Sequence, residues 1–126
     1  MSDLDRDLDL PYDEAIARIT ATLAEQGFGI ITRIDVKEVF KKKIDQDFRR
    51  YDILGACNPK FAFQALSTSL DVGTLLPCNV IAYETDDGRT HLTAVDPAER
   101  LPAGTPALKK LAAEVRERLV LALAAA

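Results

Sequence analysis

The stretch Ile53-Leu54-Gly55-Ala56-Cys57-Asn58-Pro59 places a Cys-Asn pair directly after an apolar run, and Leu75-Leu76-Pro77-Cys78-Asn79-Val80 repeats the pair further along the chain. These two copies contain the only cysteines of the sequence. Each copy adjoins residues whose composition is typical of a buried β-strand. We therefore expect the sheet of this protein, and any functional site that it carries, to be organised around the two motifs.

The first motif predicts a junction between a strand and a helix. Asn58 is a residue type that caps helix N-termini, and Pro59 suits the first helical position. Apolar residues at helical spacing then predict a helix over residues 59–70: Ala62, Ala65, Leu66 and Leu70. Cys57 would lie at its N-terminus, where free backbone amides favour a thiolate. The alternative is that Cys57 is a small buried residue at a strand–helix corner, since free cysteine is often buried.

The second motif is unusual because Pro77 interrupts an apolar strand pattern. A proline in a sheet is confined to an edge, a strand start or a bulge. A bulge would re-aim Cys78 and Asn79 toward a site. The alternative is that Pro77 merely begins the strand and that Asn79 caps a local turn.

These residues resemble the bacterial and archaeal domain of unknown function 302 family. The resemblance covers roughly residues 5 to 100 and rests on Gly-Ala-Cys-Asn-Pro at 55–59, on Gly73 and on Leu-Leu-Pro-Cys-Asn-Val at 75–80. The runs Gly27-Phe28-Gly29 and Ile34-Asp35-Val36 also fit the pattern. The resemblance implies a small α+β domain that tends to form homodimers, and it implies no activity.

Length and composition bound the class of protein. The 126 residues predict a single domain over 1–126, with a core over 5–100 and a C-terminal helix over about 105–124. A net charge of −4 argues against a general nucleic-acid binder. The N-terminus lacks a signal-peptide pattern, and the longest apolar run, residues 119–126, is too short to cross a membrane. We expect a cytoplasmic protein, no membrane partner and thiols rather than a disulfide.

The remaining patterns predict an α+β fold with a mostly antiparallel sheet of about five strands and helices packed on one face. The expected order is strand, helix, strand, short helix, strand, helix, hairpin, helix, or βαβ(α)β(α)ββα. A short alternating strand at residues 5–10 precedes a helix that Gly27 closes, and a strand follows over 28–34. In the last helix, Thr105 is the expected cap and the apolar stripe is Leu108, Leu111, Ala112, Val115, Leu119 and Leu123.

Asp87-Gly88 predicts a two-residue type I′ turn between the last two strands. This turn would pair Glu84 with His91 and Tyr83 with Leu92, and it would leave both faces of the hairpin apolar. Helices in such a fold usually cover only one face. We therefore expect a dimer partner or a bound ligand to cover the other.

Asp35 is expected to cap a short helix over residues 36–44, with one apolar face turned inward: Val36, Val39, Phe40 and Ile44. The other face carries Lys37, Lys41, Lys42 and Lys43. It predicts either a phosphate-binding patch or, because Glu38, Asp45 and Asp47 dilute it, an ordinary solvated face.

The sequence contains no catalytic constellation that we recognise, so enzymatic activity, a metal and a cofactor are left open. The single histidine, His91, and the two cysteines match neither a zinc site nor a Ser-His-Asp set. The candidate ligand-binding residues are Cys57, Asn58, Cys78, Asn79 and Arg50. Arg50 is included because an arginine this close to the Cys57 strand could bind a carboxylate or phosphate.

Three functions fit these patterns. The preferred one is a homodimeric module that binds a small anionic or soft ligand, or a partner, around the Cys-Asn motifs. The second is a thiol-based redox protein, or a metal- or haem-binding protein, that uses Cys57 and Cys78. The third is a purely structural dimerisation domain.

Overall fold

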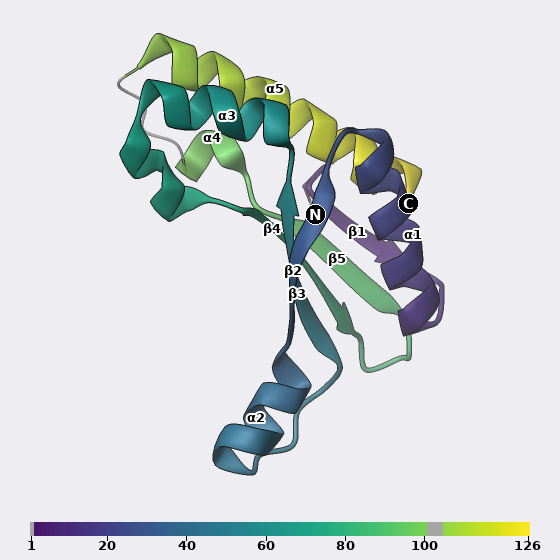
Figure 1. Ribbon diagram of the computed structural model, residues 1–126. Helices are drawn as coiled ribbons and strands as arrows, with labels where there is room; N and C mark the ends of the chain where they lie inside the picture. Colours follow the sequence, from purple (N-terminus) through teal and green to yellow (C-terminus); the bar gives the residue numbers. More distant parts are fainter. Residues whose placement is uncertain (1, 101–104) are drawn as a thin grey trace.

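The centre of the fold is a five-stranded antiparallel sheet, shown in Figure 1. The computed structural model describes residues 2–100 and 105–126. The strands are β1 (Asp5–Leu8), β2 (Gly29–Asp35), β3 (Tyr51–Cys57), β4 (Cys78–Glu84) and β5 (Thr90–Ala94). Their spatial order is β1-β5-β4-β3-β2, and every neighbouring pair is antiparallel. The predicted α+β fold and the predicted order of the elements are confirmed.

Helices connect these strands. They are α1 (Tyr12–Glu25), α2 (Val36–Ile44), α3 (Pro59–Thr68), the 3₁₀ helix η1 (Leu70–Leu75), α4 (Pro97–Arg100) and α5 (Pro106–Ala125). Helices α1 and α5 pack together on one face of the sheet, and α3 with η1 packs against α5 beyond the end of β3 (Figure 1). The sequence did not predict η1 or α4. The residues 101–104 of the expected loop lie outside the described part of the chain.

The core lies between the sheet and the pair α1–α5. Alternate residues of the central strands, among them Leu54, Val80 and Leu92, are almost completely buried. Apolar residues of the two helices pack against them: Ile16, Ile19 and Leu23 on α1, and Val115, Leu119 and Leu123 of the predicted stripe on α5. The first residues of that stripe, Leu108 and Leu111, are buried in a second cluster with Ala65 of α3 and Val72 of η1. Burial of such apolar area is the main free-energy source of the fold.

The register of the last hairpin differs from the predicted one. Thr85 N donates to Arg89 O, which makes Asp86-Asp87-Gly88 a three-residue loop, and Gly88 has a φ of +81°. This loop pairs Tyr83 with His91 and Ala82 with Leu92. The predicted two-residue turn was therefore wrong by one position, which moves Leu92 onto the helix face. The opposite face carries Ile81, Tyr83, His91 and Thr93, so it is mixed and not apolar.

Helix α2 is also placed differently from the prediction. Asp35 accepts a hydrogen bond from Glu38 N and caps the helix as expected. However, none of the helix's residues is buried, and Ile44 is 62% exposed. The helix lies at the far tip of the β2–β3 connection, away from the core (Figure 1). Its residues contact the neighbouring strands β2 and β3, and Phe40 forms an edge-to-face pair with Phe48.

Pro77 directly precedes β4, so it begins the strand and creates no bulge there. The bulge lies in β2 instead, between Ile30 and Thr32. Thr32 and Pro77 approach Gly55 of β3 from its two sides. A Cβ atom at residue 55 would lie 2.1 Å from Thr32 Oγ1 and 2.9 Å from Pro77 Cγ. Only glycine fits between these side chains.

Substituting Gly55→Ala should therefore lower the free energy of unfolding by about 1–3 kcal/mol, because Thr32 or the Pro77 ring must shift. Gly29→Ala is the matched control, since a Cβ atom there meets nothing within 4 Å. Urea unfolding of both variants measures the difference. Equal stability of the two variants would contradict the packing described for Gly55.

Candidate functional site

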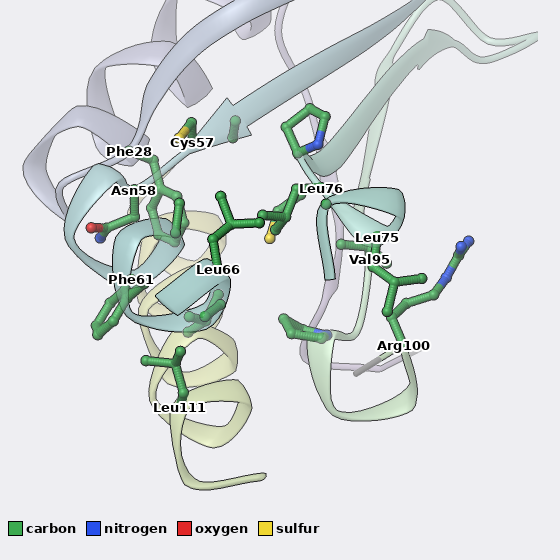
Figure 2. Close-up of a pocket in the computed structure, with 18 of the residues that line it drawn as sticks. Phe28, Cys57, Asn58, Phe61, Leu66, Leu75, Leu76, Val95, Arg100 and Leu111 are labelled. Atoms are coloured by element: carbon green, nitrogen blue, oxygen red, sulfur yellow. The ribbon is translucent and has the colours of Figure 1, made fainter. Parts of the chain in front are cut away.

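A cavity of about 360 Å³ lies at the end of the sheet where β3 stops and β4 starts. Figure 2 shows its lining, which comes from the sheet end, from α3 and η1, and from α4 and α5. Most of this lining is apolar, with Phe28, Phe61, Leu66 and Leu76 among the large side chains. Cavities of this size and composition are typical of small-molecule sites.

Both cysteines line this cavity. The strand pairing brings the two residues close together: Ala56 of β3 lies opposite Cys78 of β4, and Cys57 follows Ala56 as the last residue of β3. Both are free thiols that are partly buried. Burial raises the pKa of the Cys78 thiol to about 11, and the nearby Cys57 adds to the shift. The Cys78 sulfur is therefore a neutral thiol at pH 7, not a thiolate.

Asn58 also lines the cavity, but it holds the fold together in a way that the sequence did not predict. It occupies the N-cap position of α3 without making a side-chain capping bond. Its Nδ2 donates instead to Gln26 O, at 3.3 Å, at the end of α1. Gly27, with a φ of +87°, lies against this amide, and a Cβ atom there would be 3.0 Å from Asn58 Nδ2.

The other two candidate residues lie elsewhere. Asn79 is exposed and is not part of the cavity lining, because successive residues of a strand point to opposite faces. Its main-chain oxygen accepts from Val95 N. Arg50 precedes the opposite end of β3, seven residues from Cys57, which is about 20 Å along a strand.

Arg50 belongs to a separate polar cluster under α1. Its guanidinium lies 4.3 Å from the centre of the Tyr12 ring and pairs with Asp13. Tyr12 Oη donates to Asp52 Oδ2 at 2.6 Å, and Arg33 Nε donates to Asp52 Oδ1 at 3.0 Å. Asp52 is buried, and this pairing satisfies its carboxylate. Burial and the bond to Asp52 raise the pKa of Tyr12, so this cluster is a structural tie between α1 and the sheet.

The histidine is likewise remote from the cavity. His91 Nδ1 lies 2.5 Å from Asp7 Oδ1, and its Nε2 lies 2.7 Å from Thr93 Oγ1. The expected partner was Glu84, and the corrected hairpin register explains the difference. The contact with Asp7 links β5 to β1 at the sheet edge, and Thr93 Oγ1 adds a second link by donating to Asp5 Oδ1. Within residues 2–100 and 105–126, no group of three or more His, Cys, Asp or Glu side chains could hold a metal ion.

The sequence pattern missed one polar lining residue. Arg100 ends α4, a helix that no sequence signal indicated, and it is the single charged residue of the described cavity lining. It is exposed, so it marks where the cavity meets solvent. The sequence shows this arginine shortly after Asp96-Pro97, but no local sequence motif indicates that it lies near the cysteines in the fold.

Among the helices that the structure describes, none combines the length and the apolar character needed to span a bilayer. No curated protein matches the chain. A crystal structure of an uncharacterized conserved protein DUF302 from Bacillus stearothermophilus is similar to this structure, with a TM-score of 0.87 and 30% sequence identity. The similarity covers 95% of this chain and 94% of that one. The model of the family "Domain of unknown function DUF302" matches residues 4–126. This chain therefore belongs to the DUF302 family.

Proposed function

We propose that this domain binds a small ligand in the cavity that Cys57, Asn58 and Cys78 line. The observation that carries the proposal is the cavity itself, about 360 Å³ of space with predominantly apolar walls at the meeting point of both Cys-Asn motifs. An apolar space of this size is costly to leave open in a small domain, because close packing would otherwise stabilise the core. A ligand that fills it offsets that cost.

The lining favours binding over catalysis. The thiol of Cys78 is protonated at neutral pH, and the Asn58 amide donates a hydrogen bond to Gln26 O. The described lining includes no histidine and no carboxylate that could transfer a proton. Cytoplasmic residence, expected from the sequence, stays a prediction.

We further propose that the uncovered face of the sheet forms a homodimer. Three isoleucines lie in one row across this face, Ile34 opposite Ile53 and Ile53 opposite Ile81. Ile34 is 46% exposed, and further exposed apolar residues lie close by in the sequence: Ile31, Val39, Ile44 and Phe48. Helices α1 and α5 cover only the other face. An apolar patch on an otherwise polar surface is typical of a protein interface.

The first test is occupancy of the cavity. The neutral apolar dye N-phenyl-1-naphthylamine should fluoresce on binding to the protein. Ala62→Trp, which places an indole against the cavity, should weaken dye binding about tenfold or more. Gln64→Trp on the same helix is the matched control, because Gln64 is exposed and not part of the lining.

Circular dichroism and urea unfolding establish that both variants are folded, and the dye is excited at wavelengths that tryptophan does not absorb. Equal dye affinity for the wild type and both folded variants would mean that the dye binds elsewhere. The cavity would then have no part in ligand binding.

The homodimer is tested by light scattering at micromolar concentration. The expected mass is twice that of the 13.8 kDa chain. Ile34→Lys should shift the equilibrium to monomer, because it places a charge in the isoleucine row. Lys60→Ile on α3 is exposed and outside that row, so it should leave the dimer intact. A monomeric wild-type protein would exclude the dimer.

The state of Cys78 distinguishes ligand binding from thiol redox or metal chemistry. In a Cys57→Ala variant, iodoacetamide should modify Cys78 about tenfold or more slower than a free thiol at pH 7.5, since burial alone keeps the pKa of this thiol above its ordinary value. Burial favours the neutral thiol in the folded state. Its stabilising contribution is therefore complete below pH 9 and is lost as the pH rises toward 11.

The rate of modification should rise with pH up to about 11. Rapid modification at pH 7.5, or a disulfide that forms between Cys57 and Cys78 under mild oxidant, would support the redox alternative instead.

A further inference from the structure

Among the residues that the structure describes, those inside the cavity supply no charged side chain that could pair with a charged ligand. The thiol of Cys78 is held neutral, and the Asn58 amide already donates to Gln26 O. The remaining interior wall is hydrocarbon, including Phe61, Leu66 and Leu76. Burying a charged or strongly polar ligand group there would be unfavourable, because no hydrogen-bonding partner or opposite charge would compensate for its lost hydration. The part of a ligand that lies inside must therefore be apolar.

The mouth of the cavity has the opposite character, because Arg100 is exposed there at the end of α4. Figure 2 shows its side chain at the edge of the lining, extending away from Leu66 toward the outside. Asp96, four residues before Arg100, accepts hydrogen bonds from Arg116 Nε and from Ala98 N. Among the ion pairs of the described residues, none involves Arg100.

The two halves of the site define one chemical class of ligand. We propose that the ligand is an amphiphile with a hydrocarbon body in the cavity and a single anionic head, such as a carboxylate, beside Arg100. This inference rests on the proposed ligand-binding function and specifies the chemical class of the ligand. It locates the anion at the mouth, whereas the sequence had suggested an anion beside the cysteines.

The charge arrangement excludes two neighbouring classes. A small fully polar anion would leave the apolar walls unfilled and would gain only one solvent-exposed ion pair, which strengthens binding by about fivefold at most. A cationic amphiphile would place its head against the Arg100 guanidinium, where like charges repel. Hydrocarbon burial should thus supply most of the affinity, and Arg100 should select the sign of the head group.

The test compares three probes with the same twelve-carbon chain: dodecanoate, dodecanol and dodecyltrimethylammonium. Each displaces N-phenyl-1-naphthylamine from the wild-type protein at pH 8 and low salt, below its micelle concentration. Dodecanoate should bind about two- to fivefold more tightly than dodecanol, as an exposed ion pair allows, and the cation more weakly than both. Added salt should reduce the preference for the anion.

Arg100→Ala should abolish the preference for dodecanoate over dodecanol, and Arg100→Glu should reverse it, while dodecanol affinity stays unchanged. Arg118→Ala on α5 removes an exposed arginine that does not line the cavity, so it should keep the wild-type preference. Comparison of these variants separates a local effect of Arg100 from the general charge of the protein.

The outcomes separate the two proposals. Failure of the dye and of all three probes to bind would overturn the ligand-binding function itself. Equal binding of the three probes, or an anion preference that Arg100→Glu leaves unchanged, would overturn the role of Arg100 and leave the apolar site in place. Tight binding of short polar anions that dodecanol cannot displace would overturn the hydrocarbon body.

Discussion

The antiparallel pairing of β3 with β4 is the constraint on which the rest of the structure depends. Its register places Leu54 opposite Val80 in the core and Ala56 opposite Cys78 at the sheet end. A shift of β4 by one residue would turn Val80 toward the uncovered face and Cys78 away from the cavity. Gly55 stabilises this register, because the side chains of Thr32 on β2 and of Pro77, the residue before β4, leave no room for a Cβ atom at this position. The same contacts therefore hold the core and form the site.

Patterns that repeat over many residues allowed most of the fold to be predicted. The stripes on α1 and α5 and the capping signal at Asp35 needed no knowledge of tertiary structure. The predicted register of the hairpin was wrong because Asp86-Asp87-Gly88 fits both a two-residue and a three-residue loop. Residues 80–83 of β4 are apolar or aromatic on both faces, so the pattern of this strand did not decide between the registers. The predicted burial of the apolar face of α2 was wrong for a different reason. An amphipathic pattern does not indicate whether the core lies close enough to cover that face.

The site was predictable where strand geometry alone determines proximity. Cys57 and Cys78 flank one end of two neighbouring strands, and that neighbourhood was a reasonable expectation from chain order. Asn79 follows Cys78 on the same strand, so strand alternation already opposed placing both in one pocket. Arg100 could not have been found, because a connection of irregular structure brings α4 to the cavity and no local motif marks such a return.

The two interpretations of the cysteines, as buried corner residues and as members of a site, are compatible in this structure. A cysteine behaves as a small apolar residue with a weak donor when its surroundings keep the thiol neutral, and the walls around Cys78 do this. A neutral cysteine of this kind packs beside a cavity as other small apolar residues do. Asn58 complements the cysteines by tying the start of α3 to the end of α1. Cys57, Asn58 and Cys78 thus all border one apolar space, and Arg100 is the single charged side chain of its described lining.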